Sequence, residues 1–135
     1  MDTNITRITY RVPYADTDQM GFVYYANYLV YFERLRNELL RKTGTNYREW
    51  EAKGILLPVV EAYCRYRASA HYDDLLTISG WLSLSKGSRL RIDYEVTRDE
   101  LVLAEGYTVH ACLKTSGRPV RLPEEFLIRE DQENC

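Results

Sequence analysis

The sequence is poor in the residues from which metal sites and disulfides are built. It has three cysteines, Cys64, Cys112 and Cys135, an odd number without Cys-x-x-Cys spacing, so we expect neither structural disulfides nor a zinc site. Its two histidines, His71 and His110, lie far apart in the chain. We therefore expect no metal and no separate cofactor, although a nucleophilic dyad of Cys64 or Cys112 with either histidine stays open.

Long apolar runs and a strong charge of either sign are also absent. No apolar run approaches the roughly 18 residues that a membrane-spanning helix needs, so we expect no integral membrane span. The first residues, Met1-Asp2-Thr3-Asn4, carry an acid and no basic segment, which disfavours a secretory signal and makes the cytoplasm the expected location. Lys and Arg number 18 against 20 Asp and Glu, and this net charge of −2 argues against nucleic acid as a partner.

Glycine-rich phosphate loops and the usual hydrolase signatures are missing as well: there is no Gly-x-x-x-x-Gly-Lys, Gly-x-Gly-x-x-Gly, Gly-x-Ser-x-Gly or His-Glu-x-x-His. Of the 135 residues, 45% are hydrophobic, which is enough for one folded domain. We assign residues 1–135 to a single domain, with a core of about residues 6–127 and a polar tail at 128–135. Tyrosine dominates the aromatic residues, with 12 Tyr against 3 Phe and 2 Trp, and suits pockets and interfaces.

Hydrophobic periodicity predicts one strand, then two helices, then four more strands along the sequence. Residues 8–14 alternate between apolar and polar side chains, as a half-buried strand does. An apolar stretch followed by an amphipathic one predicts a helix over about residues 24–43, ended by Gly44, and a short helix follows at 47–53. The first half of the long helix is apolar all round, so we expect it to be buried on every side. Four alternating segments then follow, at residues 60–68, 76–84, 90–96 and 103–113.

Each of these four segments has one apolar face, which is typical of an antiparallel sheet. In the second segment the face runs from Leu76 to Leu84, and in the last it includes Leu103, Tyr107 and Val109. The order of elements indicates an α+β fold with an antiparallel sheet of about five strands. One small sheet cannot cover a helix that is apolar on all sides, so we expect a homodimer or a homotetramer.

The segment at residues 14–21, Tyr-Ala-Asp-Thr-Asp-Gln-Met-Gly, places two carboxylates and a glycine just before the long helix. Asp16 and Asp18 have a structural interpretation, because acids near a helix N-terminus are stabilised by its free N–H groups and its dipole. They also have a functional one. A carboxylate beside a tyrosine-rich helix start, with N–H groups to receive an oxyanion, suits acyl transfer or hydrolysis. The residues alone leave both interpretations open for the pair. For Asp16 they favour a turn or capping residue.

Two blocks of the sequence resemble a known family. The first is YADTDQMGFVYYANY at residues 14–28, followed by YFE at 31–33 and Arg36; the second is YRASAHYDDLL at 66–76. They resemble the 4-hydroxybenzoyl-CoA thioesterase family, and most closely its bacterial acyl-CoA thioesterase branch associated with the Tol–Pal gene cluster. The likeness spans about residues 6–127. It implies the hotdog fold, an antiparallel sheet wrapped around one long central helix, with two subunits forming a continuous sheet and active sites at their interface.

The resemblance implies an enzyme that hydrolyses the thioester of an acyl-CoA to a carboxylic acid and free CoA without metal. Asp18 would act as nucleophile or general base, and the backbone amide of Tyr25 would polarise the thioester carbonyl. Gly21, Tyr24 and Tyr28 would help to bind the substrate. The Tol–Pal-associated branch commonly has His where this chain has Tyr25, whereas the aromatic-thioester branch has Tyr. An acyl-carrier-protein thioesterase and a non-catalytic acyl-CoA-binding or partner-binding module are the alternatives.

The phosphates of CoA require positive charge, which basic residues near two predicted turns can supply. We assign phosphate binding to five residues, for each of which an ordinary solvated strand face is the alternative. Their place near the mouth of a CoA site is implied by the resemblance and not by spacing. These residues are Lys86, Ser88, Arg89, Arg91 and Arg118.

Overall fold

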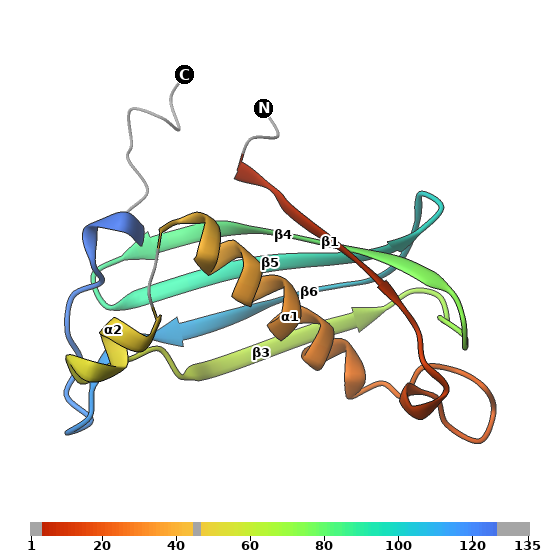
Figure 1. The fold of residues 1–135 in the computed structure, drawn as a ribbon, viewed down its shortest axis with the longest axis horizontal. Coiled ribbons are helices and arrows are strands. Elements are labelled where there is room, and N and C mark those ends of the chain that lie inside the picture. Colours follow the sequence, from red (N-terminus) through yellow and green to blue (C-terminus); the bar gives the residue numbers. More distant parts are fainter. Residues whose placement is uncertain (1–3, 45–46, 127–135) are drawn as a thin grey trace.

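The computed structural model describes residues 4–44 and 47–126 of the 135-residue chain. Within these ranges, five strands form an antiparallel sheet in the order β1-β4-β5-β6-β3, and one long helix lies across a face of it (Figure 1). The predicted α+β class and the hotdog arrangement are confirmed, whereas the tail at 128–135 lies outside the described residues. The elements are β1 (Thr6–Arg11), α1 (Asn27–Lys42), β3 (Val59–Tyr66), β4 (Leu75–Lys86), β5 (Arg89–Arg98) and β6 (Leu101–Ala111).

Short elements pack at the end of the sheet where α1 finishes (Figure 1). A short second helix is present as predicted, and its Trp50 packs edge-on against Phe126 with 4.7 Å between ring centroids. Two very short strands pair there in a second sheet that periodicity did not predict. The short elements at this end are α2 (Tyr47–Ala52), β2 (Ile55–Leu56), β7 (Leu113–Lys114) and the 3-10 helix η3 (Glu124–Phe126). A further 3-10 helix, η2 (Tyr14–Asp16), lies at the other end of the sheet, between β1 and the start of α1 (Figure 1).

Helix α1 packs closely on the sheet because two strand positions beneath it are glycines. A Cβ atom on Gly106 of β6 would lie 2.0 Å from a backbone carbonyl oxygen of β3 and 3.0 Å from the ring of Phe32. One on Gly80 of β4 would lie 2.2 Å from the side chain of Leu35. The space lets the Phe32 ring stack on Tyr94 of β5 with 4.3 Å between centroids. The core is therefore centred between α1 and the middle of the sheet.

The long helix starts later than the sequence predicts. It begins at Asn27 and not at Tyr24, because the Tyr24 N–H donates to the Asp16 carbonyl at 2.9 Å and this bond holds Tyr24 in the preceding loop. A single chain does not bury the apolar first half of this helix on every side, and burial by a second subunit stays a prediction. Leu29 and Val30 are 41% and 44% exposed, so one flank of α1 has no cover within the described chain.

Strand β6 turns the opposite face to the helix from the one that its apolar residues predict. Thr108 and His110 are buried under α1, whereas Tyr107 and Val109 point to the other side of the sheet. Leu103 is buried as predicted, but it is the extra residue of a β-bulge, because Ala104 pairs with β5 and the next pair skips Leu103. The alternation on the two sides of the bulge is therefore out of step.

Strand β4 has a similar irregularity. Its pairing with β5 skips Ser83, so that Leu82 and Leu84 do not keep the simple alternation of the strand. Leu84 pairs with Arg91 and is exposed, although periodicity places it on the buried face. The predicted apolar face of this strand thus ends at Leu82.

A chain of hydrogen bonds crosses the core from α1 to His110. Arg36 donates to the Tyr94 hydroxyl at 3.2 Å, and that hydroxyl lies 2.6 Å from Thr108 Oγ1. Thr108 Oγ1 lies 2.9 Å from His110 Nε2, and His110 Nδ1 lies 3.0 Å from the carbonyl oxygen of Leu57. Because the Leu57 carbonyl can only accept, Nδ1 carries the proton of a neutral ring and Nε2 accepts from Thr108. Each group in this series of hydrogen bonds therefore donates to the next one in the direction of the Leu57 carbonyl.

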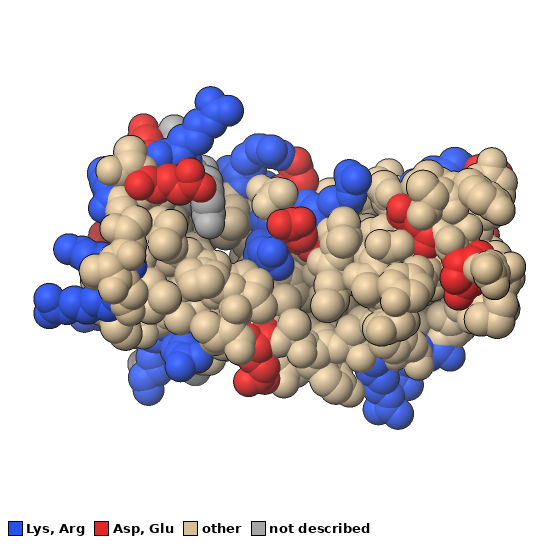
Figure 2. Space-filling view, turned by 90° about the horizontal axis from the view of Figure 1, so that it is seen from below, with Lys and Arg blue, Asp and Glu red and all other residues tan. Residues whose placement is uncertain are grey.

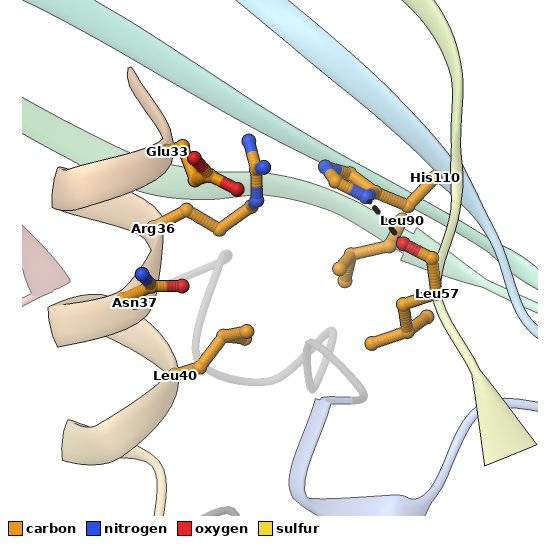
Figure 3. A pocket seen from close by; sticks show the side chains of 7 residues that line it. All are labelled: Glu33, Arg36, Asn37, Leu40, Leu57, Leu90 and His110. Atoms are coloured by element: carbon orange, nitrogen blue, oxygen red, sulfur yellow. Dashed lines mark hydrogen bonds between the residues drawn. The ribbon is translucent and has the colours of Figure 1, made fainter. Parts of the chain in front are cut away.

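A cavity of about 190 Å³ lies beside this chain, between the second half of α1 and the sheet (Figure 3). Figure 3 shows the guanidinium of Arg36 and the ring of His110 directed toward each other across it. Burial, with a contribution from the Arg36 charge, lowers the pKa of His110 to about 4. The ring is therefore neutral at physiological pH.

Strand β3 forms an edge of the sheet. Within the described chain it pairs with β6 alone, and all its residues but Cys64 are exposed. Figure 2 views the molecule from below, the side on which β3 lies in Figure 1, and uncharged residues cover much of this face.

None of the helices in the described ranges is long and apolar enough to cross a membrane.

The neutral His110 predicts that the protein loses stability as the pH falls from about 6.5 to about 4. An unfolded histidine has a pKa of about 6.5, whereas the pKa of folded His110 is about 4. Between these values the unfolded chain binds a proton that the folded chain does not, so protonation favours unfolding. We expect the free energy of unfolding, measured by urea denaturation, to fall by about 3 kcal/mol across this window.

Two variants separate His110 from other acid-sensitive groups. His110→Gln should remove most of this pH dependence, and His71→Gln, at an exposed ring, should leave it in place. The same pH dependence in the parent and in His110→Gln would contradict the assignment.

Candidate active site

The two acids of the Asp-x-Asp segment lie in a tight loop between β1 and α1, at one end of the sheet. The Gly21 N–H donates to the Asp18 carbonyl at 3.0 Å, and the Asp18 N–H donates to the Phe22 carbonyl at 2.8 Å. The side chain is held as well, because Asp18 Oδ1 accepts from the N–H of Met20 at 2.9 Å and of Phe22 at 3.2 Å. Asp18 Oδ2 has no hydrogen-bond partner among the described residues. One oxygen thus orients the carboxylate, and the other is free to react.

The peptide between Tyr24 and Tyr25 is fixed in place with its N–H unpaired. Its carbonyl, that of Tyr24, accepts from the Asn27 N–H at 2.9 Å. The next carbonyl, that of Tyr25, accepts from the Tyr66 hydroxyl at 3.0 Å. The N–H of Tyr25 has no acceptor in the part of the chain that the structure describes. A preoriented, unpaired N–H is the kind of donor that stabilises the oxyanion of a tetrahedral intermediate.

A cleft of about 350 Å³ contains Asp18 and Tyr25 together. Aromatic side chains form much of its wall: the rings of Tyr28 and Tyr66 meet edge to face with 5.1 Å between centroids, and the Tyr25 ring lies 6.4 Å from that of Tyr66. The cleft therefore joins the Asp18 loop, the start of α1 and the end of β3. Its other lining residues are Phe22, Val23, Arg67, Ala68 and Ser69.

The phenols of Tyr28 and Tyr66 in the cleft wall are neutral. Burial raises the pKa of Tyr28 and of Tyr66 above the ordinary value for tyrosine. Arg67, at the rim, forms an ion pair with Glu105 at 2.6 Å. Among the described residues that line the cleft, Asp18 is the one with a carboxylate. A carboxylate beside an unpaired N–H can serve as a nucleophile or as a general base.

Gly21, Tyr24 and Tyr28, which the resemblance assigns to substrate binding, lie at different positions relative to the cleft. Gly21 has a φ of +82°, and an added Cβ would meet no atom within 4 Å, so the backbone conformation and not the space requires glycine. Tyr28 lies in the cleft wall, whereas Tyr24 does not line the cleft and packs at 4.8 Å on the Tyr25 ring. A contribution of these residues to substrate binding stays a prediction.

The residues assigned to the CoA phosphates are not brought to this cleft within one chain. Lys86, Ser88 and Arg89 lie at the β4–β5 turn, at the opposite end of the sheet from the Asp18 loop (Figure 1). Arg118 lies beyond β7, where its carbonyl accepts from Lys114 N–H at 2.9 Å. Any contact of these residues with CoA at the cleft would have to come from another subunit.

Arg91 is engaged elsewhere. It lies on the face of the sheet away from α1, with its Nε 2.8 Å from Asp93 Oδ1 and its guanidinium 3.9 Å from the centre of the Tyr107 ring. The basic residue that the structure does bring to the cleft is Arg67, which we did not assign. Tyr66 and Arg67 are the first two residues of the second family-like block. That block was the sequence feature from which Arg67 could have been predicted as a site residue. The sequence does not show that the end of β3 lies beside the start of α1.

The thiols and histidines form no second reactive site in the described ranges. No hydrogen bond joins a cysteine to a histidine there, and burial raises the pKa of Cys64 and Cys112, which disfavours a thiolate. His110 is committed to the core hydrogen bonds, and Cys135 lies outside the described residues. No group of three or more His, Cys, Asp or Glu side chains within these ranges is arranged to hold a metal ion.

Known proteins share both the sequence pattern and the fold. The acyl-CoA thioesterase YbgC of Haemophilus influenzae is 34% identical over 117 residues, 85% of this chain and 86% of that protein. The acyl-CoA thioester hydrolase YbgC of Escherichia coli O6:H1 is 30% identical over 134 residues, 98% of this chain and 100% of that protein. The crystal structure of a 1,4-dihydroxy-2-naphthoyl-CoA thioesterase from Synechocystis matches with a TM-score of 0.84 at 25% identity, covering 90% of this chain and 92% of that one.

A family match covers the same region. Residues 12–129 match the family described as the Thioesterase-like superfamily, a range that includes the Asp18 loop, α1 and the strands from β3 to β6. The match therefore contains every residue that lines the cleft. On the strength of this match and of the fold, the chain belongs to the Thioesterase-like superfamily.

Proposed function

We propose that this protein is an acyl-CoA thioesterase in which Asp18 attacks the thioester carbonyl or activates water. The observation that carries the proposal is the free Asp18 Oδ2 in the same cleft as the unpaired N–H of Tyr25. The relatives named as acyl-CoA thioesterases, at 34% and 30% identity, support the same activity. Neither group needs a metal or an organic cofactor for this reaction, so CoA enters only as part of the substrate.

In the nucleophilic route, Asp18 Oδ2 bonds to the thioester carbonyl carbon, and the resulting oxyanion accepts from the Tyr25 N–H. Collapse of this intermediate breaks the C–S bond and releases the CoA thiolate, which takes a proton from solvent. Water then hydrolyses the acyl–Asp18 anhydride to a carboxylic acid and restores the carboxylate. In the general-base route, Asp18 Oδ2 instead accepts a proton from the attacking water. Hydroxylamine distinguishes the two routes if the product is analysed on the protein. A hydroxamate on Asp18 forms only from the anhydride, whereas the acyl hydroxamate also forms from acyl-CoA itself.

Two alternatives differ from this proposal, one in its substrate and the other in what it requires of Asp18. An acyl-carrier-protein thioesterase would use the same Asp18 and Tyr25 groups on a protein-bound thioester. A non-catalytic binding module would use the cleft and would have no need of a free carboxylate. Release of free thiol from acyl-CoA, compared with the matched acyl carrier protein, separates all three.

The substrate class and the branch of the superfamily are also proposals. The run at residues 14–28 and the YbgC relatives support the branch associated with the Tol–Pal gene cluster. Tyr25, the tyrosine-lined cleft and the naphthoyl-CoA thioesterase from Synechocystis support an aromatic acyl group. A panel of aromatic, short-chain and long-chain acyl-CoAs decides between these. The cytoplasm stays the proposed location.

We propose a homodimer, or a pair of such dimers, as the active form. The outer edge of β3 has backbone groups that a second copy can bond, and an uncovered edge strand is a ready template for pairing. Val59 and Val60 on this strand and Leu29 and Val30 on α1 are exposed apolar side chains. Tyr66 ends β3 and also lines the cleft, so a partner on this edge would lie beside the site.

Replacement of the reacting carboxylate tests the catalytic assignment. Asp18→Asn keeps the size of the side chain but removes the nucleophile or base, so we expect kcat to fall by at least about 10²-fold. Thiol release from acyl-CoA gives the rate, and circular dichroism checks that the variant folds. Asp99→Asn, at the exposed β5–β6 turn, is the matched control and should keep the parental rate. Parental turnover by Asp18→Asn would refute the assignment.

A charge on the edge strand tests the assembly. Val60→Glu should give a monomer with reduced activity, because a dimer across this edge would bury the carboxylate in an apolar contact. Leu84→Glu, which changes a residue of similar exposure on β4, should leave the dimer intact. Sedimentation velocity at micromolar concentration measures both. A fully active monomer of the parent protein would contradict the proposed assembly.

Neutralising basic residues tests the proposed phosphate contacts. Lys86→Gln, Arg89→Gln and Arg118→Gln should each raise KM for acyl-CoA by roughly tenfold, since a charge-assisted hydrogen bond is worth about 1.5–3 kcal/mol and exposure reduces it. The effect should weaken at high salt and be absent for acyl-N-acetylcysteamine, which lacks the nucleotide. Arg67→Gln is the comparison at the cleft rim. An effect of Arg67→Gln alone would assign the phosphates to the rim and overturn the role of the turn residues.

A further inference from the structure

Asp16, the first acid of the pair, is bound by phenols from two different elements. Its Oδ2 accepts a hydrogen bond from the Tyr10 hydroxyl of β1 at 2.8 Å and another from the Tyr31 hydroxyl of α1, also at 2.8 Å. Both phenols stay protonated, because burial and the neighbouring Asp16 carboxylate raise the pKa of each. A single carboxylate oxygen therefore ties strand β1 to helix α1.

The main chain of Asp16 holds the other side of the loop. Its carbonyl oxygen accepts from the Tyr24 N–H at 2.9 Å and from the side-chain amide of Asn27 at 2.9 Å. Tyr24 and Asn27 flank the short segment that carries the Tyr25 N–H. Asp16 thus contacts β1, the first turns of α1 and the segment with the proposed oxyanion donor.

These contacts are not those of a helix cap. The N-cap residue of α1 is Ala26, which makes no side-chain capping hydrogen bond, and the Asp16 carboxylate bonds to phenols and not to helix N–H groups. The capping interpretation of Asp16 is therefore wrong, although the residue does lie in a turn, at the end of η2. Asp16 does not line the cleft either, so it does not touch the substrate there.

We infer that Asp16 is a positioning residue which, with Tyr10 and Tyr31, fixes the Asp18 carboxylate relative to the Tyr25 N–H. The inference rests on the proposed function, in which those two groups react with the thioester. Thr17 alone separates the two acids in the chain, so displacement of Asp16 also displaces Asp18. A shift of about 1 Å in a reacting group can cost about 10²-fold in rate.

The two tyrosines require an oxygen acceptor at position 16 and do not require a charge there. Both hydroxyls bond to the same atom, Oδ2, and Oδ1 has no partner in the described chain. Asp16→Asn keeps a carbonyl oxygen with two lone pairs, which can accept both hydroxyls, whereas Asp16→Ala removes the acceptor. A residue that itself transferred a proton would fail in both variants.

Steady-state kinetics with acyl-CoA test the inference. We expect Asp16→Ala to lower kcat by about 10²-fold, with KM within about threefold of the parent because the cleft lining is unchanged. Tyr31→Phe should lower kcat by about tenfold, since it removes one of the two side-chain bonds. Asp16→Asn should stay within about fivefold of the parental kcat, because the acceptor is retained. Thermal unfolding of each variant shows that it is folded at the assay temperature.

The matched control is Tyr94→Phe. Tyr94 and Tyr31 are each 1% exposed, and each loses one buried hydroxyl on substitution, but the Tyr94 hydroxyl bonds to Arg36 and Thr108 and not to the loop. Tyr94→Phe should lower the unfolding temperature and keep the parental kcat. The same fall in kcat for Tyr94→Phe and Tyr31→Phe would show general loosening of the core and would overturn the inference.

A double variant tests whether Tyr31 acts through Asp16. In the Asp16→Ala background, Tyr31→Phe should cost nothing further in kcat, because its hydroxyl has already lost its acceptor. Additive losses, equal losses in Asp16→Asn and Asp16→Ala, or an unchanged kcat in Tyr31→Phe would each overturn the inference. If Asp16→Ala does not fold, Tyr31→Phe and Asp16→Asn still decide it. Parental activity of Asp18→Asn would instead overturn the proposed function, so the two failures are distinguishable.

Discussion

The close contact between α1 and the middle of the sheet determines where the other parts of this protein lie. Phe32 stacks on Tyr94 because β6 presents only Gly106 beneath the ring, and the helix therefore lies low on the sheet. Held at this height, the start of the helix is within reach of the end of β3, where the Tyr66 hydroxyl bonds to the Tyr25 carbonyl. A side chain in place of Gly106 would clash first with the Tyr63 carbonyl of β3 and then with the Phe32 ring, and would disturb both elements that form the walls of the cleft.

A series of paired hydrogen bonds explains how the core holds the buried His110 beside the half-buried Arg36. The hydrogen bonds from Arg36 to the Leu57 carbonyl run in one direction, and each buried polar group between them has a partner. A fully paired chain of this kind is inexpensive, whereas the loss of one member leaves the next one buried and unpaired. The neutral state of His110 is part of this arrangement, because a second ring proton would face the Thr108 hydroxyl in place of a lone pair.

The pattern of neighbouring residues was sufficient to predict the individual helices and most of the strands. The long helix, the short helix and the order of helices and strands along the chain follow from periodicity and from the turn residues between them. The residues around Asp18 indicated the candidate catalytic loop by resemblance. Periodicity failed where a bulge adds one residue, at Leu103 and at Ser83, because a shift of one residue exchanges the two faces of a strand. It also could not show that the turn at Lys86 and the Asp18 loop lie at opposite ends of the sheet, which is a long-range property.

The Asp-x-Asp segment shows the same limit at the scale of one side chain. Asp16 and Asp18 are chemically identical and two positions apart, yet one is bound by the phenols of Tyr10 and Tyr31 and the other by neighbouring backbone N–H groups that leave an oxygen free. Partners drawn from β1 and α1 make this difference, so the segment alone does not contain it. Position 25 follows the same reasoning. The proposed chemistry uses the backbone N–H, which every residue but proline provides, so a tyrosine in place of histidine alters the cleft wall and leaves the oxyanion donor unchanged.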